Sequence, residues 1–146
     1  MGFQVEAYQQ ALPLKSVFRI ARGAKTQADV VVVTLTDGVY TGWGESVPYA
    51  RYQESVQSVL EQIDQTAKSL ATFEGDLSGV RARINAMPSG AARNVMDCAL
   101  WDLVAKSQQK SVAQLLSLST PAPCVTAQTL SIDTPEAMAA AAKALG

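Results

Sequence analysis

Residues 30–46 place the strongest local constraint on the fold of this chain. They read VVVVTLT, then Asp37-Gly38, then VYTGWGES. The β-branched and apolar residues of the first part favour a buried strand. Asp-Gly is typical of a β-hairpin turn, because glycine adopts a positive φ without steric cost. The sequence therefore predicts two antiparallel strands, at 30–36 and 39–46.

A third strand and several helices are predicted around this hairpin. Residues 3–11 alternate in polarity as a strand does. Residues 13–29 contain proline and glycine and show little periodicity, so they are predicted to form a mobile loop. Apolar residues at spacings of three and four predict helices at 56–70, within 73–90, at 91–107 and at 111–116. Three strands followed by helices indicate an α+β domain with one small antiparallel sheet.

The helix expected at 91–107 carries four charged residues that pair by spacing. Arg93 with Asp97, and Asp102 with Lys106, are four residues apart and are expected to form ion pairs along the helix. Asp97 and Asp102 are five residues apart, so their side chains point about 140° away from each other. They are therefore not expected to share a metal ion.

The C-terminal residues begin a new pattern. STPAP at 119–123 is a boundary rich in proline and serine. Residues 126–132 have the composition of a strand, and Thr134 is a good N-cap for a helix with proline at its first position. A lone strand is marginal in water. The sequence therefore predicts one domain over 1–121 and, over 122–146, the first strand and helix of an α/β unit.

Composition excludes several classes of function. The 146 residues carry a formal net charge of −1, which gives no electrostatic reason to expect nucleic acid or a membrane surface as a partner. No apolar run approaches the roughly 20 residues that cross a bilayer. The N-terminus lacks the pattern of a signal peptide, so a cytoplasmic location is expected.

The chain contains no histidine and only two cysteines, Cys98 and Cys124. Nucleophiles activated by histidine and zinc sites that contain histidine are therefore excluded. Two cysteines do not make a disulfide framework, and both are expected to be reduced.

Four separated segments resemble a known group of enzymes. They are PLKSVFRIARGAKTQADVVVVTL (13–35), GWGESVPYARYQES (42–55), GAARNVMDCALWDLVAK (90–106) and TAQTLSIDTPEAM (126–138). In this order they resemble the N-terminal part of an enolase-superfamily enzyme of the muconate-lactonizing subgroup. The two loop sequences, FRIARGAK and GESVPYARYQES, are most similar to those of dipeptide epimerases of the L-Ala-D/L-Glu type.

This resemblance implies a capping domain followed by a barrel related to the TIM barrel. The chain resembles the whole cap, the first barrel strand and the start of the first barrel helix. In the family, lysine bases invert the α-carbon of the dipeptide and three Asp/Glu residues hold Mg²⁺. Those residues belong to barrel strands beyond Gly146, so the expected cofactor is Mg²⁺ of the full-length parent. No catalytic residue and no metal ligand is assigned in this chain.

Substrate-binding residues are expected in the two loops and in the tail. The loop at 16–29 resembles the family's lid, where Arg22 and Lys25 are placed to meet a substrate carboxylate. Without the resemblance, both would be read as solvated surface charges.

The loop at 46–54 resembles the second specificity loop. Its Tyr49 and Tyr52 either wall the substrate pocket or pack the loop onto the sheet. Thr129 falls toward the end of the expected barrel strand that faces the active site. It is either a pocket residue or a β-branched residue that merely favours a strand.

Several alternatives remain at this point. The same cap also serves cycloisomerases and o-succinylbenzoate synthases, whose ligands would not need Arg22 and Lys25. A different class is a non-catalytic binding module, or half of a split protein whose barrel is another chain. A cap without its barrel exposes apolar surface, so self-association of the isolated chain is expected, and a homo-oligomer remains open.

Overall fold

The structure is a computed structural model that describes residues 2–145. Its sheet has three strands in the order β1-β2-β3, namely β1 (Gln4–Ile20), β2 (Gly23–Thr36) and β3 (Thr41–Ser46). Strands β2 and β3 are antiparallel, with a register that runs from Val31 opposite Ser46 to Thr36 opposite Thr41. The predicted hairpin and antiparallel sheet are confirmed.

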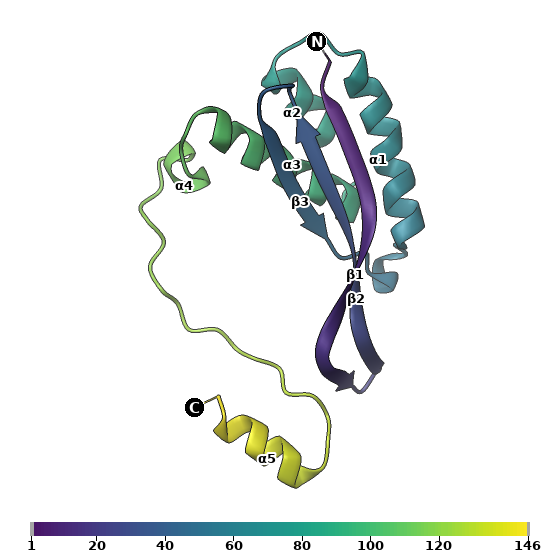
Figure 1. Ribbon diagram of the computed structural model, residues 1–146, viewed down its shortest axis with the longest axis vertical. Helices are drawn as coiled ribbons and strands as arrows, with labels where there is room; N and C mark the ends of the chain where they lie inside the picture. Colours follow the sequence, from purple (N-terminus) through teal and green to yellow (C-terminus); the bar gives the residue numbers. More distant parts are fainter. Residues whose placement is uncertain (1, 146) are drawn as a thin grey trace. The chain divides into compact units, whose positions relative to one another are not determined.

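The helices follow the sheet in the chain, as predicted. They are the 3-10 helix η1 (Ala50–Tyr52), α1 (Val56–Ala71), α2 (Leu77–Asn85), α3 (Ala91–Ser107), α4 (Val112–Leu115) and α5 (Pro135–Lys143). The first three α-helices lie against one face of the sheet (Figure 1). An α+β domain with a small antiparallel sheet is therefore correct.

The turn between β2 and β3 is built around the Asp37 side chain. Its Oδ1 accepts hydrogen bonds from the backbone N–H groups of Val39, at 2.9 Å, and Tyr40, at 2.7 Å. Gly38 has φ +92°, a value that side chains disfavour. The connection therefore has four residues rather than two, because the carboxylate holds a wider turn.

Alternation along β2 and periodicity along α3 create the core. Val31, Val33 and Leu35 are fully buried on the helix side of the sheet. The buried residues of α3 that pack in this core are Ala92, Val95, Met96, Ala99, Leu100 and Leu103. These six residues recur at spacings of three and four, the kind of pattern that predicted the helix at 91–107.

Two glycines of β3 allow α3 to approach the sheet closely. A Cβ on Gly42 would lie 2.0 Å from the carbonyl oxygen of Ala99, and one on Gly44 would lie 2.1 Å from that of Val95. Both distances are far below van der Waals contact, so any side chain at these positions would push the helix away. Strand β3 therefore meets the backbone of α3 directly.

The outer edge of β3 is bonded to side chains of α3. Asp102 Oδ2 accepts from the backbone N–H of Trp43 at 2.8 Å, and Lys106 Nζ donates to the carbonyl oxygen of Thr41 at 2.9 Å. The same two side chains form the predicted ion pair, at 2.6 Å. Two backbone groups of β3 that face away from β2 are thereby satisfied.

The other predicted ion pair of α3 is wrong. Asp97 lies 3.9 Å from Arg81 of α2, whereas Arg93 donates to Ser89 Oγ at 2.8 Å. Arg81 also stacks over the ring of Trp101, with its guanidinium carbon 4.3 Å from the ring centroid. Packing of α2 beside α3 thus offers Asp97 a different cation.

The predicted loop at 13–29 is also wrong. Strands β1 and β2 continue through it as one long hairpin whose turn is at Ala21 and Arg22. Pro13 suggested a break, but β1 is an edge strand, where a missing N–H is tolerated. The pairing of two strands thus outweighs a local break signal.

The predicted strand at 126–132 does not form in the described chain. Residues 121–134 have no regular structure. Only their end pairs with β1, where Ile132 N donates to the carbonyl oxygen of Arg19 at 2.8 Å and Ser131 Oγ accepts from Arg19 N at 2.9 Å. Without a neighbouring strand along its length, strand-like composition is insufficient. Helix α5 does form, and its N-cap Thr134 accepts from Ala137 N as predicted.

The chain divides into two compact units. One comprises Met1–Gln10 and Asp29–Pro121, and the other comprises Ala11–Ala28 and Ala122–Gly146. The tip of the β1–β2 hairpin groups with the C-terminal residues and not with the first unit. The domain boundary expected between residues 121 and 122 stays a prediction.

Substitution of Gly44 by alanine tests the close packing of β3 on α3. We expect Gly44→Ala to destabilise the chain by about 3 kcal/mol, the upper end of the range for overpacking, because its Cβ meets backbone. Urea denaturation measures this change. Thr41→Ala on the same strand, whose side chain is exposed, is the control and should cost less than about 1 kcal/mol. Equal midpoints for the two variants would contradict this account.

Candidate functional site

Two backbone hydrogen bonds close a 3-10 turn in the loop between β3 and α1. Within η1, Tyr52 N donates to the carbonyl oxygen of Tyr49 at 2.8 Å, and Gln53 N donates to that of Ala50 at 3.0 Å. Gln53 then adopts φ +61°, which reverses the chain toward α1. No residue of η1 is buried. The shape of this loop therefore does not come from apolar packing.

An open cavity of about 730 Å³ lies between this loop and the first turns of α1 and α3. Its lining includes Glu45, Ser46, Tyr49, Tyr52, Glu54, Ser58, Gln62, Ser89 and Asn94. The rings of Tyr49 and Tyr52 are adjacent, with centroids 6.0 Å apart. Tyr49 is 39% exposed and Tyr52 is 71% exposed. The two rings thus form an aromatic wall that remains largely open to solvent.

Glu54 joins the loop to the beginning of α3. Its Oε1 accepts from the backbone N–H of Ala91 at 2.6 Å, and its Oε2 accepts from the backbone N–H of Tyr49 at 3.2 Å. Helix α3 has Gly90 as its N-cap, which supplies no capping side chain. The carboxylate therefore caps α3 from outside the helix, where its charge also meets the positive end of the helix dipole.

Ser46 is the buried polar residue of this region. It is 7% exposed, and its Oγ has no hydrogen-bond partner among residues 2–145. Serine at this position continues the small side chains of Gly42 and Gly44 along the face of β3 that meets the helices. A buried hydroxyl without a protein partner does not stabilise a fold, and Ser46 also lines the open cavity.

The remaining predicted site residues lie in the second compact unit. Arg22 is in the turn of the β1–β2 hairpin, and Lys25 follows it on β2. Thr129 lies in the irregular segment that precedes α5. All three are exposed. Of the five predicted residues, the structure therefore brings Tyr49 and Tyr52 together at one cavity.

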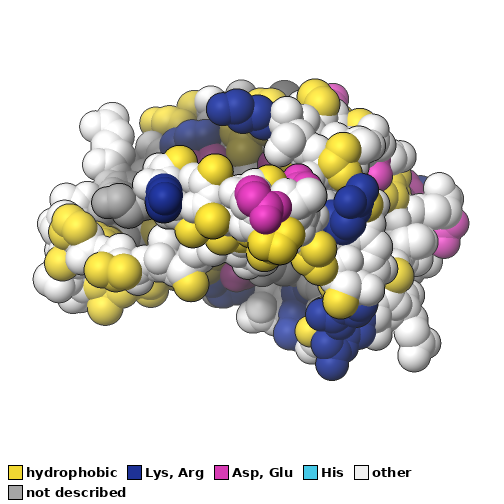
Figure 2. Space-filling view, turned by 90° about the horizontal axis from the view of Figure 1, so that it is seen from below, with side chains coloured by type: hydrophobic (Ala, Val, Ile, Leu, Met, Phe, Trp, Pro, Cys, Tyr) yellow, Lys and Arg dark blue, Asp and Glu magenta, His cyan; other side chains and the backbone are white. Residues whose placement is uncertain are grey.

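The face seen in Figure 2 carries basic side chains in separate groups, with acidic and apolar side chains between them. Within residues 2–145, no three metal-ligating side chains of His, Cys, Asp or Glu come together. The described chain therefore does not provide the carboxylate cluster that Mg²⁺ needs.

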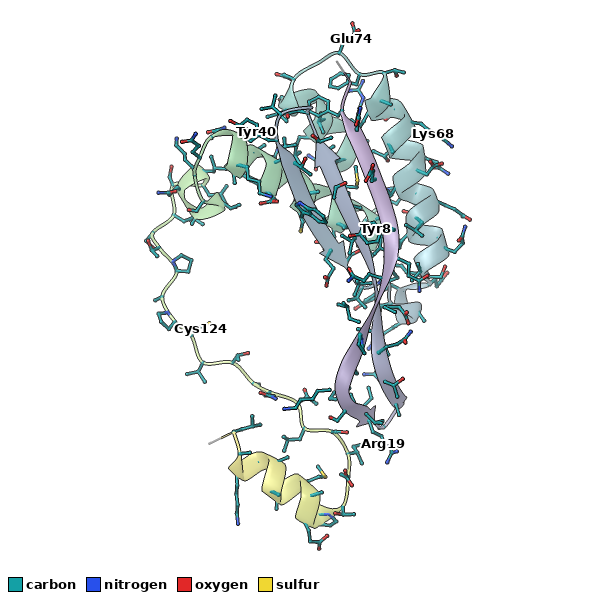
Figure 3. All side chains as sticks on the ribbon, in the orientation of Figure 1. Tyr8, Arg19, Tyr40, Lys68, Glu74 and Cys124 are labelled. Atoms are coloured by element: carbon teal, nitrogen blue, oxygen red, sulfur yellow. The ribbon has the colours of Figure 1, made fainter. Side chains whose placement is uncertain are left out.

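The cysteines and the helices add two simple findings. Cys98 and Cys124 are free thiols, as expected, and Cys124 lies on the extended segment between α4 and α5 (Figure 3). None of the helices within residues 2–145 combines the length and hydrophobicity that a bilayer span requires.

Sequence reasoning missed Glu54, Gly90 and Ser46. The available signal was indirect. Gly90 precedes a strongly predicted helix but supplies no capping group, so the first N–H groups of that helix need an acceptor from elsewhere. Nothing in the local sequence indicates that Glu54, 37 residues from Ala91, is that acceptor.

Comparison with known proteins identifies the family. Residues 3–117 match the N-terminal domain of mandelate racemase and muconate lactonizing enzyme. The chain belongs to this family. The predicted membership of the enolase superfamily is thereby confirmed.

Two relatives are nearly half identical in sequence to this chain over the aligned residues. The L-Ala-D/L-Glu epimerase of Escherichia coli strain K12 is 44% identical over 141 residues, which are 97% of this chain and 43% of that protein. An N-acetyl-D-glutamate racemase of Pseudoalteromonas sp. is 45% identical over 117 residues, 80% of this chain and 36% of the relative. The chain thus spans less than half the length of these relatives.

Solved structures confirm the fold of a dipeptide epimerase's N-terminal part. An enolase family member from Agrobacterium tumefaciens, solved with sodium and L-Ala-L-Glu and with an ordered loop, is 42% identical with a TM-score of 0.81 over 95% of this chain and 41% of that chain. The dipeptide epimerase of Enterococcus faecalis V583, complexed with Mg and L-Leu-L-Tyr, is 27% identical with a TM-score of 0.80 over 97% of this chain and 42% of that chain.

Replacement of Ser46 by alanine tests whether its hydroxyl is unsatisfied. Because Ser46→Ala removes a buried hydroxyl without a protein partner, we expect stability to be unchanged or to rise by about 1 kcal/mol. Thermal unfolding gives the measurement. Ser55→Ala is the contrasting variant and should lose about 1 kcal/mol, because Ser55 forms the capping box of α1. A loss in Ser46→Ala as large as that in Ser55→Ala would show that Ser46 Oγ has a partner.

Proposed function

We propose that this chain is the N-terminal, substrate-selecting part of a Mg²⁺-dependent dipeptide epimerase of the L-Ala-D/L-Glu type. The reaction removes and returns the proton at the α-carbon of one residue of the dipeptide and so inverts that centre. In this proposal the chain supplies the hairpin tip and the loop that contact the substrate. The acid–base groups and the metal ligands belong to a barrel outside this chain.

One observation carries the choice of substrate. The relatives at 44% and 45% identity are both named for substrates that contain glutamate. The solved relative at 42% identity holds L-Ala-L-Glu, whereas the one at 27% holds L-Leu-L-Tyr. These three relatives at 42% to 45% identity therefore all have a substrate with a second carboxylate, as does an L-Ala-D/L-Glu epimerase of Bacillus subtilis at 25% identity.

The proposed roles follow from the chemistry of that substrate. Arg22 and Lys25 are the cations that we assign to the substrate's carboxylates, with Arg22 able to bond in a bidentate manner. Tyr49 and Tyr52 provide apolar surface with hydroxyl groups at its edge. Thr129 contributes a hydroxyl from the segment before α5.

A fusion protein tests this proposal. This chain is joined to the part of the Escherichia coli epimerase that lies beyond the matched residues, and turnover of L-Ala-L-Glu with Mg²⁺ is measured. We expect epimerisation. Arg22→Ala should lower kcat/KM by about tenfold to a hundredfold, because a hydrogen bond to a charged group is worth about 1.5–3 kcal/mol.

Controls separate specificity from general damage. Lys15→Ala removes a cation from the same hairpin and should leave kcat/KM within about twofold, since exposed charges without a substrate contact contribute little. A dipeptide without an acidic side chain should be affected less than L-Ala-L-Glu by Arg22→Ala. An active fusion in which Arg22→Ala and Lys25→Ala both behave like Lys15→Ala would remove the basis for an acidic substrate.

A further inference from the structure

We infer that Glu54 is the positioning residue of the aromatic wall, which is Tyr49 and Tyr52. Its carboxylate fastens the loop that carries both rings to the N-terminus of α3. The inference rests on the proposed function in taking this wall as a substrate surface. The claim that the Glu54 carboxylate sets the loop conformation does not depend on the proposed function.

Burial fixes little of the wall. No residue of η1 is buried, and Tyr52 is 71% exposed. The two internal hydrogen bonds of η1 close a single turn but do not attach that turn to the rest of the molecule. The hydrogen bond from Tyr49 N to Glu54 Oε2 reaches a side chain that is itself anchored to α3.

The backbone of Glu54 is fixed from both sides. The preceding residue, Gln53, has a left-handed conformation, and the following residue, Ser55, is the N-cap of α1 with a complete capping box. Glu54 itself is only partly exposed. Its side chain therefore has a defined starting point from which to reach α3.

Gly90 provides the space that this carboxylate occupies. A Cβ on Gly90 would lie 2.5 Å from Glu54 Oε1, well inside van der Waals contact. Gly90 also has φ 154° and ψ −170°, a region that is essentially restricted to glycine. The N-terminus of α3 has no capping side chain of its own, and the Glu54 carboxylate supplies the missing acceptor.

Glutamine is the informative replacement for Glu54. Its amide has a single acceptor oxygen, whereas the carboxylate serves Ala91 N and Tyr49 N with one oxygen each. Glu54→Gln therefore keeps the volume of the side chain but leaves one of the two N–H groups without its acceptor. The weaker and longer bond, to Tyr49, is the one that we expect to be lost.

Amide hydrogen exchange of the full 146-residue chain, resolved by NMR, tests this inference. In Glu54→Gln the amides of Tyr49, Tyr52 and Gln53 should exchange about tenfold faster. Amides in the core of β2 should be unchanged. Gly90→Ala, which displaces the carboxylate from the other side, should accelerate the same loop amides. Glu61→Gln, an exposed glutamate of α1, removes the same charge and should leave the loop unaffected.

Unchanged exchange of the loop amides in both Glu54→Gln and Gly90→Ala would overturn the inference. Uniform acceleration across β2 and the loop in both variants would overturn it as well, because Glu54 would then act on global stability. Local acceleration in either variant supports it.

The fusion enzyme adds a kinetic readout. Glu54→Gln should raise KM for L-Ala-L-Glu several-fold with kcat within about twofold, because the wall contacts substrate and not the reacting atoms. A loss confined to kcat would contradict the positioning role. An inactive fusion would count against the proposed function alone, since the exchange measurement decides the inference without turnover.

Discussion

The direct contact between the backbone of α3 and strand β3 determines most of the structure. It exists because β3 has glycine at two successive positions on its inner face, Gly42 and Gly44. The closeness of this approach seals the core that Val33 and Leu35 fill from β2. It also brings the N-terminus of α3 level with the end of β3, where the open cavity and its loop lie.

The candidate site therefore depends on helix ends more than on the sheet. Its cavity is bordered by the first turns of α1 and α3, each of which needs acceptors for unpaired N–H groups. Ser55 supplies one within α1, and Glu54 supplies the other across to α3. Glu54 and Ser55, which are adjacent at the end of the loop, thus cap α3 and α1 respectively. A loop with exposed tyrosines retains a defined shape because its ends are tied in this way.

The sequence predicted the features that are determined within one segment better than those that depend on distant segments. The limits of α3 follow from a periodic pattern within one segment, and the predicted range of 91–107 was correct to the residue. The strands through 13–29 were missed because Pro13 and Gly23 resemble breaks, whereas Pro13 lies on the edge strand β1 and Gly23 only begins β2 after the turn. Residues 126–132 showed the opposite error, since a strand needs a neighbour that composition does not reveal. Tyr49 and Tyr52 came from the family resemblance, but the link between Glu54 and Ala91 spans the sequence and leaves no local trace.

The bonds from Asp102 and Lys106 to the edge of β3 have a consequence for behaviour in concentrated solution. A bare strand edge is a template on which another chain can add a strand and begin to aggregate. Here the carbonyl oxygen of Thr41 and the N–H of Trp43 are already bonded to the ion pair of Lys106 and Asp102. An exposed ion pair adds little stability of its own. Its value lies in the association that it prevents, and it directs any intermolecular strand addition toward β1 at the opposite edge.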